Sequence, residues 1–317
     1  MSELVEALSL PVHAGLAWRT LQSDDVDAVA SLLAAALEID GGLPFAADAA
    51  FFEPRHLPPP PGTAVGAFAE AGRLVAAGAI RPDPSEEARR AIIIGQVHPY
   101  ARGRCIGTAL LRWGMAAGRA LLAGCSPDLP RGLVVATEGL TDAATRLYER
   151  NGFVQEFAED VMRRDLTGAL PEAPFPPGIT VTAWTPERAG AFFEAYQDAF
   201  RDRPGFPGWT QEEWVEWIAG DDDFRPAMSL LARSGDEPVG FAVCDEAWIA
   251  QIGVRPGWRG HGLGAALLAE VMRRFHSAGC DAVSLGVNVN NPTAARLYTR
   301  LGFEVVGRRA RWALEIV

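Results

Sequence analysis

The hexapeptide Arg259–Gly264, "RGHGLG", decides how this chain is interpreted, because its glycines separate two strongly patterned segments. The apolar run "IAQIGV" before it predicts a strand, and the segment after it repeats apolar residues at helical spacing, which predicts a helix over about 263–277. The first turn of a helix exposes unpaired N–H groups and partial positive charge, so it can hold a phosphate. Glycines let the backbone approach closely, and Arg259 can add a charged hydrogen bond. The stretch therefore predicts a pyrophosphate cradle, although a tight structural turn explains the glycines equally well.

The same pattern occurs a second time, earlier in the chain, at Arg102–Gly107, "RGRCIG". Each copy runs strand, glycine turn, amphipathic helix, strand, short helix and strand, and the short helices end in related motifs, "RLYERNGF" and "RLYTRLGF". Repeats of this length indicate duplicated domains. The proline-rich stretch 166–178 between them is typical of a linker. We therefore expect an N-terminal lobe over 1–165 and a C-terminal lobe over 179–317.

Each lobe is expected to be an α/β lobe, a mixed sheet that carries helices. In the C-terminal lobe, "SGDE" between two apolar runs predicts a hairpin, and Thr185 followed by Pro and Glu predicts a capped helix start. The cluster "HLPPPPG", His56–Gly62, predicts a loop, since consecutive prolines fit neither a helix nor the centre of a sheet. Further strands are predicted over 179–184, 247–254, 282–288 and 304–316, and a short helix over 291–301.

Composition excludes several classes of function. The chain has 317 residues, of which 49% are hydrophobic and 22% charged, a globular composition with room for two cores. The formal net charge of −11 disfavours a nucleic-acid or membrane partner. All 29 basic residues are arginine, so lysine Schiff-base and P-loop lysine chemistry are excluded. The cysteines and histidines show no zinc or disulfide spacing, and the chain shows no leader or apolar span, so we expect no metal and a cytoplasmic protein.

Two motifs in the C-terminal lobe carry a resemblance to a known family. The first is V-x-P-x-x-R-G-x-G-x-G-x-x-L-L, in "VRPGWRGHGLGAALL", and the second is N-x-x-A-x-x-L-Y-x-x-x-G-F, in "NPTAARLYTRLGF". In this order they resemble the GNAT superfamily of N-acyltransferases, whereas a dinucleotide fingerprint would follow the first strand of a βαβ unit. The resemblance covers essentially the whole chain as two tandem GNAT lobes, in a layout similar to that of the mycothiol synthases.

The resemblance implies that acetyl-coenzyme A (acetyl-CoA) is the co-substrate and that the glycine turn holds its pyrophosphate. It also implies that the strand before the turn hydrogen-bonds the pantetheine arm, with one N–H facing the thioester oxygen to stabilise developing negative charge. Asn291 matches a position that contacts this arm. The cofactor-binding residues expected on this basis are Ile252, Gly253, Val254, Arg259, Gly260, His261, Gly262, Leu263, Gly264 and Asn291.

The resemblance also assigns catalytic roles. Tyr298 matches the general acid that protonates the departing thiolate. Many relatives carry a Glu base on the strand before the turn, but Trp248 and Ala250 stand at the facing positions here. Glu246, acting through water, is the candidate base, and a solvated residue at a strand start is the alternative. The missing base favours an amine of low basicity, since such an amine is easier to deprotonate.

The segment after the first helix of the C-terminal lobe is expected to form the substrate wall, again by resemblance. Asp202, Phe206 and Trp209 are its candidate substrate residues, because aromatic and acidic side chains suit a sugar-like or aromatic cation. Trp214 and Trp217 are spaced by one helical turn, so we expect both in the core. The acidic run 221–223 is expected to be a solvated turn.

The first lobe departs from the family pattern at two positions, Cys105 and Thr141, where the second lobe has Gly262 and Asn291. A cysteine side chain crowds the approach of a phosphate. Catalysis is therefore expected in the second lobe, with the first as scaffold, substrate wall or vestigial binder. Arg102, Gly103, Gly107 and Tyr148 remain, so binding of acetyl-CoA by the first lobe stays open. The residues of that second, candidate cofactor site are Val97, Arg102, Gly103, Arg104, Ile106 and Gly107.

Taken together, these patterns predict N-acetylation of a small amine by acetyl-CoA, through direct attack in a ternary complex. The acceptor is expected to be an amino-sugar, a thiol-sugar or an antibiotic-like amine, and the enzyme a monomer or homodimer. A non-catalytic acyl-CoA-binding sensor or partner protein is one alternative. A protein N-terminal acetyltransferase is another, because the acidic loop could accept a basic peptide.

Overall fold

The computed structural model describes residues 9–13, 15–42, 63–83, 89–123, 129–203 and 206–316. The predicted loop His56–Gly62 lies outside these residues. The chain forms two compact units: unit 1 is Met1–Asp160 with Val306–Val317, and unit 2 is Val161–Val305. Within the described residues, none of the helices combines the length and apolar character that crossing a membrane requires.

Unit 1 is a mixed sheet with the strand order β1-β2-β3-β4-β5-β12, in which β4 and β5 run parallel. Its strands are β1 (Ala17–Thr20), β2 (Ala64–Phe68), β3 (Leu74–Pro82), β4 (Arg89–Val97), β5 (Arg131–Thr137) and most of β12 (Glu304–Ile316). Its helices are α2 (Val26–Asp40), α4 (Ile106–Ala123) and α5 (Asp142–Arg150), with short 3-10 helices η1 (Ser23–Asp25), η3 (Glu70–Gly72) and η4 (Pro99–Ala101).

Unit 2 repeats this plan with the order β6-β11-β10-β9-β8-β7, in which β10 and β11 run parallel. Its strands are the end of β6 (Val154–Asp165), β7 (Ile179–Ala183), β8 (Leu230–Ser234), β9 (Glu237–Cys244), β10 (Trp248–Val254) and β11 (Ala282–Asn288). Its helices are α6 (Ala189–Phe200), α7 (Gln211–Ala219), α8 (Leu263–Ser277) and α9 (Pro292–Arg300), with 3-10 helices η5 (Pro186–Arg188) and η6 (Pro256–Trp258).

The two units exchange their last strands. In unit 1, Ala310–Ile316 of β12 pair antiparallel with Arg131–Thr137 of β5, although β12 closes the second sequence copy. In unit 2, β6 of the first copy lies beside β11, and Leu166 N–H donates to the Asp281 carbonyl at 2.8 Å. The units therefore differ at these strands from the lobes expected over 1–165 and 179–317. A self-similar sequence cannot reveal this, because either final strand satisfies the same ladder of backbone hydrogen bonds.

Several predicted elements are confirmed at their boundaries, namely the helix at 263–277 and the strands at 282–288 and 304–316. The predicted start of the helix at Thr185 is corrected. A 3-10 turn, η5, comes first, and Thr185 makes no side-chain cap for it. The preceding Trp184 is buried, and its N–H donates to the Ser229 carbonyl at 2.9 Å, which fixes how the chain enters this turn.

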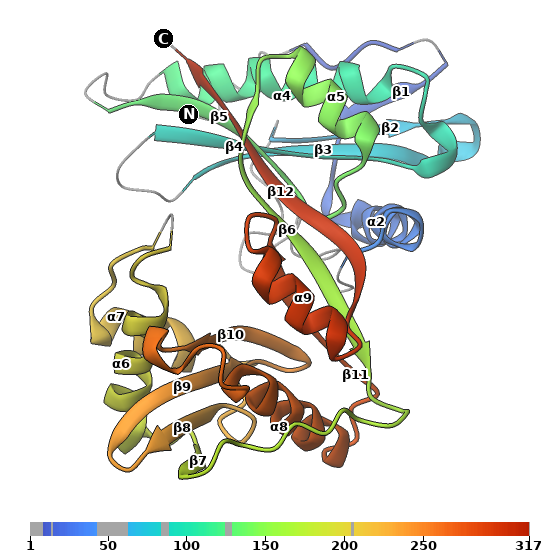
Figure 1. The fold of residues 1–317 in the computed structure, drawn as a ribbon. Coiled ribbons are helices and arrows are strands. Elements are labelled where there is room, and N and C mark those ends of the chain that lie inside the picture. Colours follow the sequence, from blue (N-terminus) through green and yellow to red (C-terminus); the bar gives the residue numbers. More distant parts are fainter. Residues whose placement is uncertain are drawn as a thin grey trace. The chain divides into compact units, whose positions relative to one another are not determined.

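The sheet of unit 2 is covered on both faces (Figure 1). On one face, α8 and α9 bury a core that includes Leu267, Phe275 and Leu285. On the other, α6 and α7 bury an aromatic core that includes Phe192, Trp214 and Phe241. Burial of each such side chain contributes about 1.5–3 kcal/mol, so the two cores hold β10 firmly between them.

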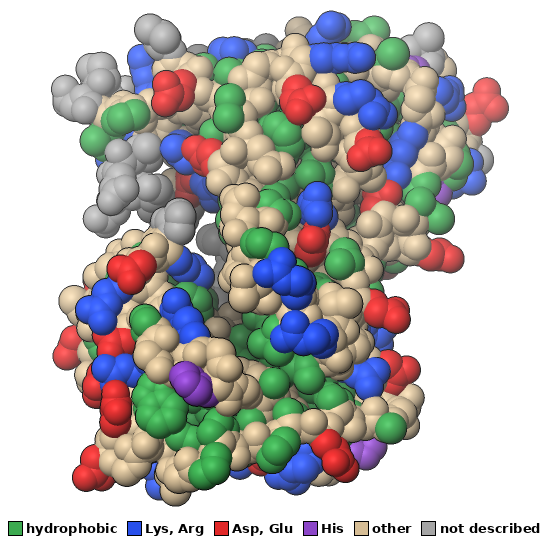
Figure 2. All heavy atoms as spheres, in the orientation of Figure 1, with side chains coloured by type: hydrophobic (Ala, Val, Ile, Leu, Met, Phe, Trp, Pro, Cys, Tyr) green, Lys and Arg blue, Asp and Glu red, His purple; other side chains and the backbone are tan. Residues whose placement is uncertain are grey.

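Acidic, basic and apolar side chains are interspersed over the face of the molecule shown in Figure 2. Such mixing matches a chain that carries 29 basic and 40 acidic residues. The described residues of this face therefore offer no broad single-sign field of the kind that captures a polyanion.

Candidate active site

The parallel strands β10 and β11 separate in the middle of unit 2. Their ladder consists of Trp248 with Ser284 and Ile249 with Leu285, although the strands continue to Val254 and Asn288. On its other side β10 stays paired with β9, but the register shifts between Ile249 and Gln251, which marks a bulge at the point of divergence. A bulge re-aims the backbone and frees its polar groups, and it is therefore a common device beside active sites.

The glycine turn follows the open end of this splayed pair. Gly260 and Gly262 have φ of 80° and 83°, and a Cβ placed on either would meet nothing within 4 Å. Gly262 is the N-cap residue of α8, and the first helical hydrogen bond runs from Ala266 N–H to its carbonyl at 3.0 Å. The N–H groups of the first turn of α8 therefore have no partner within the helix and lie beside open space. His261 is exposed, Gly264 half-buried and Leu263 buried in the core. This arrangement fits a diphosphate.

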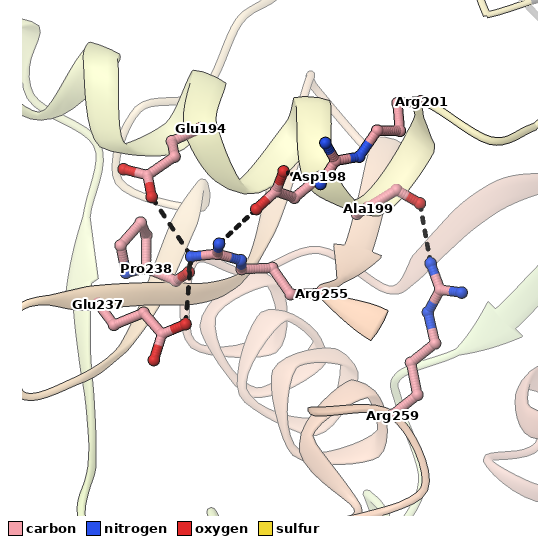
Figure 3. A network of polar contacts seen from close by, with 8 residues as sticks. All are labelled: Glu194, Asp198, Ala199, Arg201, Glu237, Pro238, Arg255 and Arg259. Carbon is pink, nitrogen blue, oxygen red and sulfur yellow. Dashed lines mark hydrogen bonds and ion pairs between the residues drawn. The ribbon is translucent and has the colours of Figure 1, made fainter. Parts of the chain in front are cut away.

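Arg259 braces the turn. Its Nε–H donates to the Val254 carbonyl at 3.1 Å, and its Nη2–H donates to the Ala199 carbonyl near the end of α6 at 3.0 Å (Figure 3). The guanidinium thus ties the turn to β10 and α6. Its remaining N–H groups are what it can offer to an anion.

A second arginine, Arg255, fixes the same helix from the other side of η6. Its guanidinium pairs with Asp198 and with Glu194 on α6, and with Glu237 at the start of β9 (Figure 3). It also donates to the Pro238 carbonyl at 2.9 Å. With 21% of its side chain exposed and 17% of that of Asp198, this pair is shielded from solvent. Arg255 therefore joins α6, through two ion pairs, to the start of β9, through two further contacts.

The strand residues before the turn are close-packed. Gly253 lies so near α6 that a Cβ there would approach Ala199 Cβ and Phe241 at 2.8 Å. Ile252 and Val254 face the other side and pack on the core of α8 and α9. Asn291 caps α9, because its side-chain oxygen accepts from Ala294 N–H at 3.1 Å. Its amide N–H groups can donate to a ligand. Thr141 caps α5 in unit 1 in the same way, at 3.2 Å.

Tyr298 lies on α9 with 7% of its surface exposed and packs against Phe303 at 6.0 Å between ring centroids. Burial raises the pKa of its phenol to about 12, so it is protonated at neutral pH. Tyr148 of unit 1 is its structural counterpart. It is also buried, and burial raises its pKa to about 12 as well.

The candidate base Glu246 is exposed in the turn between β9 and β10. Its neighbour Asp245 is half-buried, and burial, with Asp221 and Asp223 contributing, raises the pKa of this carboxyl to about 6.

A polar residue that the sequence patterns did not single out lies further along β10: Gln251 accepts a hydrogen bond from Trp214 Nε1–H at 3.1 Å. Its position on the same strand face as Gly253 is the signal that could have revealed it.

The expected substrate wall is an aromatic cluster. Phe206 and Trp209 are half-buried on the core of α6 and α7, and Asp202 is exposed. The prediction that Trp214 is in the core is confirmed, since it is fully buried. The same prediction for Trp217 is wrong: its side chain is 49% exposed and pairs with Trp209 at 5.3 Å. A separation of three residues turns the two indoles about 60° apart on a helix, enough to place one of them at the surface. The acidic run 221–223 is exposed, as predicted.

The glycine turn of unit 1 has a similar backbone but different side chains and side-chain contacts. Gly103 has φ of 76°, and Cys105 has φ of 61° where unit 2 has Gly262. Arg102 donates to the Val97 carbonyl at 3.2 Å, as Arg259 does to Val254, but its Nη1 and Nη2 groups both donate to Asp40, at 2.6 Å each. The Arg104 carbonyl contacts the His13 side chain. Ile106 is buried, and Gly107 lies in the first turn of α4. The strand β4 pairs with β3 without a bulge.

Comparison with known proteins agrees with this geometry. A model of the acetyltransferase (GNAT) family matches residues 27–153 and again 189–303. The chain is 31% identical over 325 residues to a mycothiol acetyltransferase of Frankia alni, covering 93% of each protein. It is 35% identical over 215 residues to a mycothiol acetyltransferase of Streptomyces scabiei, covering 65% of this chain and 66% of that relative.

Among solved structures, a GCN5-related N-acetyltransferase from Sphaerobacter thermophilus matches with a TM-score of 0.76 and 29% identity, covering 97% of both chains. The two family matches follow each other along the chain, and each contains one glycine turn and one copy of the "RLY" motif, with Tyr148 in the first and Tyr298 in the second. The chain is therefore an N-acetyltransferase and belongs to the acetyltransferase (GNAT) family, of which it holds two domains in tandem.

Proposed function

We propose that unit 2 transfers the acetyl group of acetyl-CoA to the amine of a small acceptor, and that unit 1 does not catalyse. The observation that carries this proposal is the splayed pair β10 and β11, which leads to a glycine turn with open space beside it. Acetyl-CoA supplies the acetyl group as a thioester. The residues of the chain bind it, exclude water and stabilise charge.

The turn would hold the diphosphate through the free N–H groups at the start of α8, strengthened by the partial positive charge of the helix end. Arg259 keeps the turn in place through its two carbonyl contacts. The bulge between Ile249 and Gln251 leaves β10 backbone unpaired toward β11, so an N–H there is available to the thioester oxygen. A fixed N–H at this position contributes most when negative charge develops on that oxygen.

Tyr298 would donate its O–H to the departing sulfur. Its pKa of about 12 lies well above that of a thiol, about 8.5, so complete proton transfer to a free thiolate is unfavourable by roughly 5 kcal/mol. The phenol therefore acts mainly as a hydrogen-bond donor while the C–S bond breaks. The thiolate then takes its proton from water, and water receives the proton that the amine nitrogen loses as the amide bond forms.

The acceptor proposed is an amine of low basicity, such as the cysteinyl amine of a thiol-sugar. An alkyl amine with a pKa near 10.4 costs roughly 4.6 kcal/mol to deprotonate at pH 7, whereas an α-amine near 7.8 costs about 1 kcal/mol. Glu246 is exposed in the turn before β10, so an acceptor that needs little help from a base fits best. The relatives named mycothiol acetyltransferase support the thiol-sugar class.

Calorimetric titration of acetyl-CoA, with stoichiometry recorded, tests this proposal. We expect one site per chain, which Gly262→Trp abolishes because the indole fills the open space beside the turn. Gly279→Trp is the matched control, since Gly279 also has a positive φ, 87°, and nothing within 4 Å, but lies beyond the other end of α8. Gly107→Trp in unit 1 should leave the titration unchanged. No binding by the wild type would rule out the acetyl-CoA assignment, and a site lost with Gly107→Trp would transfer it to unit 1.

A further inference from the structure

Trp214 is held rigidly beneath β10. It is fully buried, stacks on Tyr196 with 4.9 Å between ring centroids, and meets Trp184 and Phe241 at 6.1 and 6.2 Å. Its one polar atom, Nε1, donates to the side-chain oxygen of Gln251 at 3.1 Å. A buried indole N–H without a partner costs about 1–3 kcal/mol, so the packing around Trp214 maintains this bond.

The bond to Trp214 determines which way the Gln251 amide faces. An indole N–H can only donate, so the amide oxygen of Gln251 must be the end that points at it. The amide nitrogen, with two N–H donors, therefore points away from the aromatic core. Among the described residues it has no hydrogen-bond partner, and Gln251 is half-buried rather than enclosed.

Gln251 also lies at the point where β10 and β11 separate, which is the proposed place of acetyl transfer. It comes directly after the bulge in β10, beyond Ile249, the last residue paired with β11. It lies on the same strand face as Gly253, where an added Cβ would approach Ala199 and Phe200 of α6. The Gln251 side chain thus lies next to the splay, on the face of β10 that α6 and α7 cover and on which Phe206 and Trp209 pack.

We infer that Gln251, oriented by Trp214, binds the acceptor by donating a hydrogen bond to an oxygen next to its amine. The inference rests on the proposed function. An amide N–H cannot accept a proton from the acceptor, and it repels an ammonium group. Nor can it usefully bind the amine nitrogen, because that nitrogen must keep its lone pair for attack on the thioester. The group that satisfies it is an acceptor-only oxygen, and a carbonyl adjacent to the carbon that bears the amine fits this requirement.

Gln251 is thus an acceptor-binding residue and Trp214 a positioning residue. This arrangement distinguishes acceptors that carry the oxygen from those that lack it. An acceptor without the oxygen leaves the Gln251 N–H groups unpaired, and this penalty lowers its binding relative to an acceptor with the oxygen. The arrangement also fits an acceptor that needs little help from a base, because a carbonyl next to the amine lowers the basicity of that amine.

Two probes and two variants test the inference. The probes are cysteinamide, which carries the carbonyl, and cysteamine, which carries the same thiol and amine without it. Acetylation is followed by mass spectrometry of the N-acetyl product, and kcat/KM is compared per neutral amine across a pH series. Wild type should prefer cysteinamide by about tenfold, the size of one well-placed hydrogen bond. Gln251→Leu should remove the preference, mainly through KM for cysteinamide, and leave the KM for acetyl-CoA unchanged.

Gln251→Glu is the matched variant, because a carboxylate keeps the bond from Trp214 and replaces the two donors by an acceptor. It should reverse the preference in favour of cysteamine. A direct readout is the side-chain amide signal of Gln251 in nitrogen-15 NMR, identified by its loss in Gln251→Leu, which should shift on addition of cysteinamide and not of cysteamine.

An unchanged preference in both variants, or equal signal shifts with both probes, would overturn the inference. So would a wild type that binds acetyl-CoA and acetylates neither probe. Failure of acetyl-CoA to bind at all would instead overturn the proposed function.

Discussion

Asp40 binds Arg102 through two hydrogen bonds of 2.6 Å each, and only 7% of the Asp40 side chain is exposed. The equivalent arginine of unit 2, Arg259, donates instead to a backbone carbonyl of α6, that of Ala199. Both arginines tie the glycine turn to the end of the first long helix of their unit. In unit 1 the tie is a neutralised ion pair, so the guanidinium is already satisfied and adds no positive charge for a diphosphate.

Asp40→Asn should destabilise unit 1. The change leaves Arg102, 30% exposed, without its counter-charge, at a cost of about 2 kcal/mol in the free energy of unfolding. Denaturant unfolding of Asp40→Asn, Arg102→Ala and the double variant forms a cycle that isolates the pair. A coupling energy near zero would contradict the prediction, and turnover should stay at the wild-type level in Asp40→Asn.

Tyr298→Phe should lower kcat by about one to two orders of magnitude, since one hydrogen bond to the departing sulfur is lost when charge develops there. Acetyl-CoA affinity should change little. Tyr148→Phe is the matched control, because Tyr148 is equally buried and its pKa is raised to the same value, about 12. Steady-state kinetics measures kcat for both variants, and calorimetry measures their affinity for acetyl-CoA. Equal effects of the two changes would mean that Tyr298 acts only through packing.

Asp245→Asn should stabilise the protein at neutral pH. Burial raises the pKa of this carboxyl in the folded state to about 6, above the ordinary 3.8, so folding opposes its ionisation. The penalty is absent below about pH 4 and grows as the pH rises to 6. Because the group is only half-buried, we expect a gain of about 1 kcal/mol at pH 7.5 after allowance for solvent screening, and none at pH 4.

Denaturant unfolding at both pH values measures this gain, with Asp222→Asn, at an exposed neighbour in the facing turn, as control. A gain of the same size at pH 4 would show that the effect does not come from ionisation.

Gly253→Ala should reduce both stability and turnover. The added Cβ would lie 2.8 Å from Ala199 Cβ, which cannot rotate away, so α6 must shift relative to β10. Overpacking of this kind costs about 1–3 kcal/mol. Gly257→Ala, where a Cβ meets nothing within 4 Å, is the control and should behave as wild type. Thermal unfolding and kcat/KM report the two effects, and wild-type values for Gly253→Ala would show that α6 is free to adjust.

The glycine turn shows which features of the fold the sequence predicts. Spacing alone located α8 at 263–277, and the paired motifs identified two copies of one domain. The sequence did not predict which side chains contact one another. Asp40 stands far from Arg102 in the chain, and nothing in local spacing connects them. Trp217 was misplaced for a related reason, since helical period gives the angle between two residues but not the width of the buried face.

The sequence by itself determined what short-range patterns encode: the elements, their order, the duplication and the residue types of the two glycine turns. Only the tertiary structure decided which strand completes each sheet, where β10 and β11 separate, and which way the Gln251 amide faces. The physical reason is that local backbone preference acts over a few residues, whereas pairing, burial and the direction of a hydrogen bond depend on groups that meet only when distant parts of the chain are folded together.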